Sequence, residues 1–287
     1  MLFDRIKASL LGVVFMLVAA PIAAQQDAPL RQLDDANEAR AWEGVGRIDL
    51  KGIGFCTGAL ITPRHVLTAA HCLFNRDTGE TIPVEKISFS AGLREGRAVA
   101  YREVRRTIVH QDYNFGIADS MLRVAADIAL IELDRPIRES VVRPFERFHR
   151  PQAGDEVMVV SYARERENAP SVQDRCRMLA RENDVLVYSC DVDFGASGSP
   201  IFVMSDARPK IASVVSAMAQ WQSKDVALGA ALGGPLDELL NQLAKTDPVF
   251  RSVQVPDVEA ATRVSINRQL GRQPQTVFKS VLPQVGD

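Results

Sequence analysis

Three short segments of the sequence carry residue types that can act together in nucleophilic catalysis. The first ends in a histidine, His71, which follows the apolar run 66–70. The second places an acid, Asp127, directly before the apolar run 128–131. The third places Ser197 in a turn between Gly195 and Gly198. Taken singly, they are typical of an ordinary histidine, a strand edge and a loop.

Together, the three segments supply the parts of an activated hydroxyl nucleophile. A serine hydroxyl attacks poorly until a base takes its proton, and that base needs a fixed tautomer, which an acid on its far ring nitrogen provides. Glycines beside the serine let backbone amides approach a developing oxyanion without an intervening Cβ. The residue types therefore favour acyl-transfer chemistry.

The elements that must position these residues are mostly short strands. Apolar and β-branched runs alternate with turn signals such as residues 153–155 and 182–184, a pattern typical of an antiparallel barrel or sandwich. The expected strands are residues 45–50, 55–61, 86–91, 98–109, 128–133, 157–163, 185–190, 200–204 and 211–217. One helix is predicted, because Leu236, Leu239, Leu240 and Leu243 form an apolar stripe after a Gly-Gly-Pro sequence.

Composition sets outer limits on the fold and on the partners. The chain has 287 residues, of which 46% are hydrophobic and 24% charged, which is ordinary for a globular protein with one large or two small cores. Collagen-like, coiled-coil and fully disordered chains are excluded. The formal net charge of -2 gives no electrostatic footprint for a nucleic-acid partner.

The first 24 residues are typical of a signal peptide. Arg5 and Lys7 precede an apolar run at 8–20, and small residues lead to Ala24, where we expect cleavage. A membrane anchor is the alternative, but Gly12 and Pro21 break the run, which is short for a membrane span. We therefore expect export to a secreted or periplasmic location, with the mature form free of the membrane.

Export changes how the four cysteines are interpreted, because an oxidising compartment lets them pair. Four cysteines allow three connectivities, and the local pairs Cys56 with Cys72 and Cys176 with Cys190 are the least costly to form. Each bridge would stabilise the fold by about 3 kcal/mol. A zinc site is the weaker interpretation, because neither pair has the short spacing of zinc ligands.

With these motifs in hand, the sequence resembles the chymotrypsin-like (trypsin-fold) serine endopeptidases. Residues 67–72 are similar to that family's catalytic-histidine motif, residues 127–130 to its catalytic-aspartate motif, and residues 195–200 to its nucleophile turn. Residues 214–216 match the strand that lines the substrate cleft. The resemblance covers residues 42–245, with the three motifs in the family's order of His, Asp and Ser.

The resemblance implies an all-β fold of two six-stranded antiparallel barrels, with the cleft between them and a C-terminal helix. It implies that Ser197 is the nucleophile, His71 the general base and then acid, and Asp127 the orienting carboxylate. The amides of Gly195 and Ser197 would form the oxyanion hole. Protein or peptide substrates are expected, with no metal and no cofactor. The alternative is a catalytically silent trypsin-fold binding protein, whereas an α/β-hydrolase is excluded because no histidine follows Ser197.

Activation should also differ from that of family members which are switched on by cleavage. Those members carry an aspartate directly before the nucleophile, where it pairs with a newly freed amino terminus. Here that position holds Ala196, so we expect the usual zymogen switch to be absent.

Substrate choice depends on a few positions around the specificity pocket. The Ser-Gly-Ser-Pro sequence at 197–200 resembles the bacterial glutamyl-endopeptidase branch, but Val215 stands where that branch usually has a histidine. Asp191 lies six residues before Ser197, the offset of the acid that pairs with Arg or Lys in trypsin-type members. The resemblance also assigns Ser216 and Met218 to the substrate-binding strand. Preference for Arg or Lys is the hypothesis, and a strand cap is the alternative role for Asp191.

The sequence thus predicts four segments. They are a signal peptide at 1–24, an N-terminal segment at 25–41, a peptidase domain at 42–245 whose barrels meet near 135–152, and a flexible or loosely docked tail at 246–287.

Overall fold

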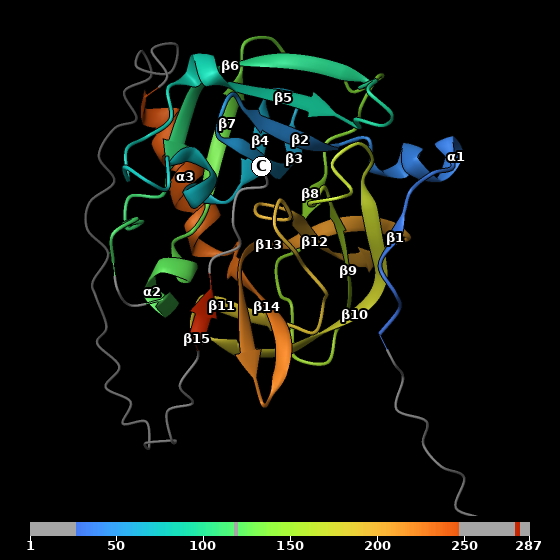
Figure 1. The fold of residues 1–287 in the computed structure, drawn as a ribbon, viewed down its shortest axis with the longest axis vertical. Coiled ribbons are helices and arrows are strands. Elements are labelled where there is room, and N and C mark those ends of the chain that lie inside the picture. The colour runs from blue at the N-terminus through green and yellow to red at the C-terminus, as the bar shows by residue number, and fades with distance from the viewer. Residues whose placement is uncertain (1–26, 118–119, 247–278, 282–287) are drawn as a thin grey trace, which may run out of the picture.

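Two β-barrels, one above the other in Figure 1, make up most of the protein. The computed structural model describes residues 27–117, 120–246 and 279–281. The expected signal peptide at 1–24 lies outside these residues. Within the described ranges, no helix has the length and apolar character needed to cross a membrane.

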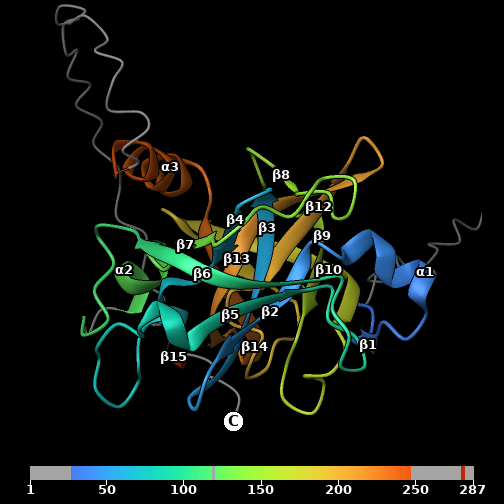
Figure 2. The same cartoon turned by 90° about the horizontal axis from the view of Figure 1, so that it is seen from above.

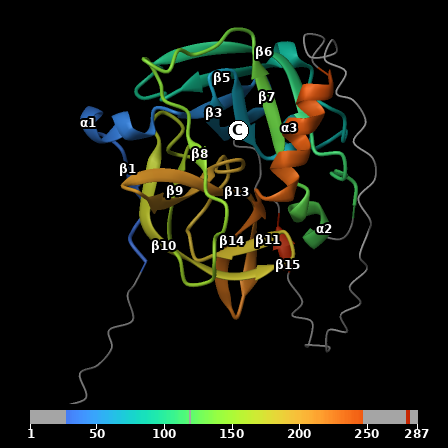
Figure 3. The same cartoon turned by 180° about the vertical axis from the view of Figure 1, so that it is seen from behind.

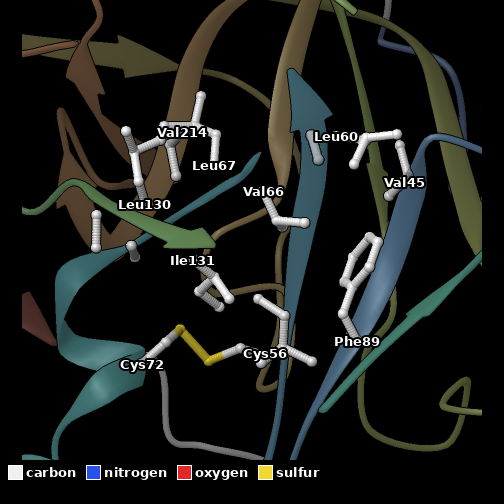
Figure 4. Close-up of a cluster of buried hydrophobic side chains, with 14 of the residues drawn as sticks. Val45, Cys56, Leu60, Val66, Leu67, Cys72, Phe89, Leu130, Ile131 and Val214 are labelled. Atoms are coloured by element: carbon white, nitrogen blue, oxygen red, sulfur yellow. A yellow bond between two sulfur atoms is a disulfide. The ribbon is translucent and has the colours of Figure 1, made fainter. Parts of the chain in front are cut away.

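The first barrel is closed by six antiparallel strands in the order β2-β3-β4-β7-β6-β5. Its strands are β2 (Val45–Leu50), β3 (Gly54–Thr62), β4 (His65–Thr68), β5 (Ile87–Ala91), β6 (Ala100–Val109) and β7 (Ala129–Leu133). All five residues of β7 are buried, which explains why its sequence is an apolar run interrupted only by Glu132. Figure 4 shows side chains from these strands gathered into one cluster together with Val214 of the second barrel.

The second barrel closes through the order β9-β10-β11-β14-β13-β12, with β12 pairing back to β9. Its strands are β9 (Glu156–Ser161), β10 (Ser171–Glu182), β11 (Val185–Tyr188), β12 (Pro200–Ser205), β13 (Arg208–Trp221) and β14 (Lys224–Ala231). Three short strands add to it: β1 (Arg31–Gln32) on β10, and β8 (Glu146–Arg147) and β15 (Lys279–Val281) on β13. The predicted fold of two six-stranded barrels with a C-terminal helix is therefore confirmed.

Helices lie around the barrels. The α-helices are α1 (Ala36–Ala39), α2 (Ser120–Ala125) and α3 (Gly234–Thr246), and the 3-10 helices are η1 (Arg40–Trp42), η2 (Ala70–Leu73) and η3 (Val84–Lys86). The predicted helix is α3, whose Leu236 and Leu239 are buried in the core of the first barrel. Figures 2 and 3 show α3 beside β6 and β7, on the side of the barrel opposite α1.

Both predicted disulfides are present, and together they account for all four cysteines. Cys56 on β3 bonds to Cys72 in η2, with their Cα atoms 6.2 Å apart. Cys176 on β10 bonds to Cys190, with their Cα atoms 5.1 Å apart. The first bridge fixes the end of β4 to the neighbouring strand, and the second fixes the segment that leads into the turn carrying Ser197.

The expected tail at 246–287 is described only in part. Of its residues beyond the helix, 279–281 form β15 and pair with β13, while 247–278 and 282–287 lie outside the described residues.

Candidate active site

His71 and Asp127 meet because their strands are antiparallel neighbours. The pairing of β4 with β7 places Thr68 opposite Ala129 at one end of the ladder. His71 follows one of these residues and Asp127 precedes the other, so both lie just beyond the same end. The ring Nδ1 of His71 is 2.6 Å from Asp127 Oδ2, and the His71 backbone N–H donates to Asp127 Oδ1 at 2.8 Å.

The carboxylate of Asp127 also fixes the tautomer of the histidine. An ionised carboxylate only accepts hydrogen bonds, so the bond to Nδ1 places the imidazole proton on that nitrogen. The lone pair of Nε2 is then available to take a proton. The sequence predicted that these two side chains would act together, and the structure brings them together.

Further groups surround Asp127, which is itself 0% exposed. Ser216 on β13 donates its hydroxyl proton to Asp127 Oδ2. Tyr113, whose phenol is buried, lies near Asp127. Burial raises the pKa of Tyr113, and the negative charge of Asp127 raises that pKa further. The predicted role of Ser216 in substrate binding stays a prediction, and its side chain supports the carboxylate.

Ser197 sits at the centre of a tightly constrained turn. Its carbonyl accepts a hydrogen bond from Thr57 N–H at 2.9 Å, and the neighbouring Gly198 N–H donates to Val215 on β13 at 2.8 Å. The turn is therefore tied to both barrels at once. Among the described residues, the Ser197 hydroxyl has no hydrogen-bond partner although it is buried. It lies on the turn without a bond to His71 in this structure.

Glycine is required at two places in this turn. Gly195 has φ +90°, and a Cβ there would lie 2.4 Å from the Phe55 ring. Gly198 has φ +77°, and a Cβ there would lie 2.1 Å from Thr68 Oγ1. Any other residue would be strained by the backbone angle and by the collision.

Two backbone amides of the turn remain available to bind an oxyanion. Ala196 N–H is used internally, donating to the Asp193 carbonyl at 3.0 Å. By contrast, the N–H groups of Gly195 and Ser197 donate no hydrogen bond to any residue that the structure describes. These are the two amides that the resemblance assigns to an oxyanion hole.

A cavity of about 740 Å³ opens where the segment before Ser197 faces the end of β13. Its lining residues are Ser189, Cys190, Asp191, Val192, Met218, Ala219, Gln220, Asp225 and Val226. The structure thus brings two of the predicted specificity residues, Asp191 and Met218, to one cavity. Ser216 does not line it.

Asp191 is exposed to solvent, and its backbone N–H donates to Gln173 Oε1 at 2.7 Å. Burial lowers the pKa of nearby Arg166 overall, although the negative charges of Asp193 and Asp191 act to raise it. A charge in contact with water interacts less strongly than a buried one, so Asp191 is a weaker recognition group than a buried carboxylate would be.

The position before the nucleophile, Ala196, is fully buried and carries no charge. The nearest acid in the turn, Asp193, accepts a hydrogen bond from the neighbouring Phe194 N–H at 2.6 Å. No carboxylate therefore occupies the position where the usual zymogen switch would need one.

Two groups of side chains among the described residues come close enough to share a metal ion. In the group of Cys56, His71 and Cys72, the two sulfurs are already joined in a disulfide. In the other group, His110 Nδ1 accepts from Asp112 N–H, which leaves the ring proton on Nε2, 3.2 Å from Glu238. The disulfide therefore removes the two sulfurs of the first group as thiolate ligands.

Sequence reasoning missed two residues that support the site, Tyr113 and Thr57. Tyr113 lies near Asp127, and Thr57 bonds to the turn that carries Ser197 through both its backbone and its hydroxyl, which donates to the Gly195 carbonyl at 3.1 Å. Ser216 was named as a substrate-binding residue, but its hydrogen bond to Asp127 was not predicted. These contacts depend on the tertiary structure.

Comparisons with known proteins point to one family. The sequence model of the family described as Trypsin matches residues 35–227 of this chain. A glutamyl endopeptidase of Bacillus licheniformis is 27% identical over 159 residues, covering 54% of this chain and 48% of that protein. Serine protease 23 of Rattus norvegicus is 29% identical over 176 residues, covering 54% of this chain and 44% of that protein.

A solved structure supports the same fold. The structure titled as a Glu endopeptidase in complex with MPD has a TM-score of 0.62 at 19% identity, and the match covers 76% of this chain and 97% of that one. This similarity concerns the fold alone. The chain spans about half the length of the curated relatives named above.

Proposed function

The chain belongs to the trypsin family, and from this premise we propose that it is a serine endopeptidase whose nucleophile is Ser197. His71 is the base and Asp127 is the carboxylate that orients it. The observation that carries the proposal is the double attachment of His71 to Asp127, at 2.6 Å through the ring and 2.8 Å through the backbone. This attachment leaves Nε2 as the basic atom. His71 lies in η2, just after β4, whose Thr68 lies beside Gly198 of the turn.

The proposed reaction has two halves. His71 Nε2 takes the proton of the Ser197 hydroxyl as its oxygen attacks the substrate carbonyl, and the resulting oxyanion is stabilised by the amides of Gly195 and Ser197. The imidazolium then gives its proton to the leaving amine, and an acyl-enzyme remains. Water, activated by the same nitrogen, hydrolyses that ester and restores Ser197.

For specificity, we propose that the enzyme cuts after Arg or Lys. Support comes from the charges around the cavity: Asp191 and Asp225 line it, and none of its described lining residues is basic. A glutamate side chain would be repelled there, whereas a guanidinium or ammonium group would be attracted. The competing candidate is cleavage after glutamate, which the name of the Bacillus relative favours.

Cleavage of a peptide library tests this choice. We expect cuts after Arg and Lys, and we expect Asp191→Asn and Asp225→Asn each to lower that preference by about fivefold, because both carboxylates are exposed and an exposed ion pair contributes up to about 1 kcal/mol. Asp184→Asn, which alters a carboxylate outside the cavity lining, is the control. Cuts after glutamate, or a preference indifferent to both substitutions, would contradict the proposal.

We also propose that the protein is exported, with residues 1–24 as the signal peptide. Two disulfides support this, because such bridges persist in oxidising compartments. Amino-terminal sequencing of protein recovered from the periplasm or medium should begin at Gln25, and recovery of the unprocessed chain from the cytosol alone would contradict export.

A further inference from the structure

One edge of β13 is shared by three partners along its length. Its first part pairs with β12, ending at Val214 opposite Pro200. Val215 then exchanges hydrogen bonds with the nucleophile turn, donating to Ser199 at 2.9 Å and accepting from Gly198 at 2.8 Å. Beyond that point, the same edge pairs with β15. The opposite edge of β13 is occupied by β14.

Along this edge of β13, β15 therefore pairs just beyond the turn that carries Ser197. β15 is antiparallel to β13, with Val281 opposite Met218 and Lys279 opposite Gln220. It is the short red strand at the lower left of the second barrel in Figure 1. Only Ser216 and Ala217 separate this pairing from the bonds of Val215 to the turn. At about 3.4 Å per residue, three residues place the pairing about 10 Å from those bonds.

The candidate active site is closed to solvent in this structure. Ser197 is 0% exposed and His71 is 2% exposed. A serine without accessible surface cannot be reached by a peptide from solution, so its side chain must become exposed before substrate binds. β15 lies on the strand edge that leads directly to this serine, and it is attached by only three residue pairs.

We propose that the edge of β13 at residues 218–220 is a peptide-binding edge and that β15 of this same chain is its resident occupant. The segment holds the edge by adding a strand, which is how extended peptides commonly bind to sheets. It thereby competes with substrate for main-chain hydrogen bonds beside Ser197. This inference rests on the proposed peptidase function, whose regulation it describes.

Removal of the segment tests the inference. A chain ending at Phe278 is compared with the full chain. We expect kcat/KM on a short peptide to be about tenfold higher in the shortened chain, mainly through a lower KM. This is the change expected if the edge is free one tenth of the time in the full chain. Val281→Pro in the full chain should have a similar effect because it blocks strand pairing. Gln275→Pro, outside the pairing, is the matched control. A synthetic peptide of residues 279–287 should inhibit the shortened chain competitively, and a scrambled peptide should not.

Hydrogen exchange separates this inference from the proposed function. Amide protons of β13 that the pairing protects, within residues 218–220, should exchange faster in the shortened chain than in the full chain, whether or not either form is active. Unchanged exchange together with unchanged KM would overturn the inference and leave the peptidase intact. Faster exchange in a chain that neither cleaves peptides nor reacts at Ser197 would support the strand pairing and overturn the proposed function.

Discussion

A single carboxylate organises the candidate site at the scale of residues. Asp127 accepts from the ring and the backbone of His71 and from the hydroxyl of Ser216. Three accepted bonds nearly fill the lone pairs of a carboxylate, so the imidazole has little freedom to rotate or to change tautomer. In the proposed mechanism, the imidazole that acts on Ser197 is thus held by a carboxylate that is itself fully buried.

Substitutions at these residues should lower kcat/KM by amounts that depend on the role of each residue. Ser197→Ala and His71→Ala should each lower kcat/KM by about 10⁴-fold or more, and Asp127→Asn by about 10⁴-fold through the wrong tautomer. Ser216→Ala removes one supporting hydrogen bond of about 1–2 kcal/mol, so it should cost about tenfold. Steady-state kinetics gives these values, and circular dichroism checks that each variant folds. Full turnover by purified Ser197→Ala would contradict the assignment.

At this scale, the sequence predicts residues whose neighbours in the chain carry a motif. His71, Asp127 and Ser197 each lie within such a motif. The support of Asp127 by Ser216 joins residues 89 positions apart, and the exposure of Asp191 depends on how Gln173 holds its backbone. Contacts of this kind arise from the tertiary structure, so no local pattern encodes them.

At the scale of elements, the register between β4 and β7 positions His71 and Asp127. The two disulfides brace different parts of the candidate site. Cys56–Cys72 holds η2, which contains His71, against β3. Cys176–Cys190 holds the segment at the specificity cavity against β10.

Removal of each disulfide by a pair of alanines should therefore have distinct effects. Each loss should lower stability by about 3 kcal/mol, because the closed loops have similar lengths. Loss of Cys56–Cys72 should lower kcat, whereas loss of Cys176–Cys190 should change mainly the choice of substrate. Thermal unfolding and peptide-library cleavage measure these effects, and equal kcat in both variants would contradict the bracing role of the first bridge.

Glu132 on β7 should make the first barrel sensitive to acid. Burial, which leaves its side chain 3% exposed, tends to raise its pKa, but hydrogen bonds from Arg106 at 2.5 Å and Arg105 at 2.7 Å outweigh burial and lower the pKa overall. A carboxyl group whose pKa is lower in the folded state stabilises the protein above its unfolded pKa of about 4.3, and this stabilisation is lost as pH falls through the folded pKa.

The sign of this effect can be measured with one variant. Glu132→Gln should lower stability at pH 7 by about 1–3 kcal/mol, and the difference from the parent chain should shrink as pH falls below about 4. Glu182→Gln, at an exposed end of β10, is the control and should change little. A stability difference that stays constant between pH 7 and pH 3 would contradict this assignment.

At the scale of the whole molecule, we expect Ala196, directly before Ser197, to determine how activation works. Ala196 cannot pair with a new amino terminus, so protein beginning at Gln25 should hydrolyse peptides without a defined cut, and acetylation of its terminal amine should not matter. The C-terminal segment would only set the level of that activity. Activity that appears after one cut and disappears when the new amine is acetylated would show that another acid, such as Asp193, has taken over the role.

The sequence predicts α3 and most of the strands, because a leucine stripe and alternating apolar runs carry their own periodicity. The arrangement in two barrels follows from the family resemblance, and the strand pattern leaves out β10 and β14. The sequence does not predict α1 and α2, which have four and six residues and are too short for a helical period to be visible. It also predicts a flexible or loosely docked tail without the strand β15, since a three-residue strand has no pattern that distinguishes it from a loop. Its partner on β13 becomes apparent only once the second barrel is assembled.

Covalent labelling of the mature protein by a fluorophosphonate, followed by peptide mapping, tests the central claim most directly. The reagent is used on both the full chain and the chain ending at Phe278, so that the C-terminal segment cannot conceal the site. An activated serine at Ser197 predicts one adduct, on that residue, formed faster in the shortened chain and absent in His71→Ala. An adduct on a different serine, or none in either chain, would contradict a Ser197 peptidase and would favour a trypsin-fold protein that binds without catalysis.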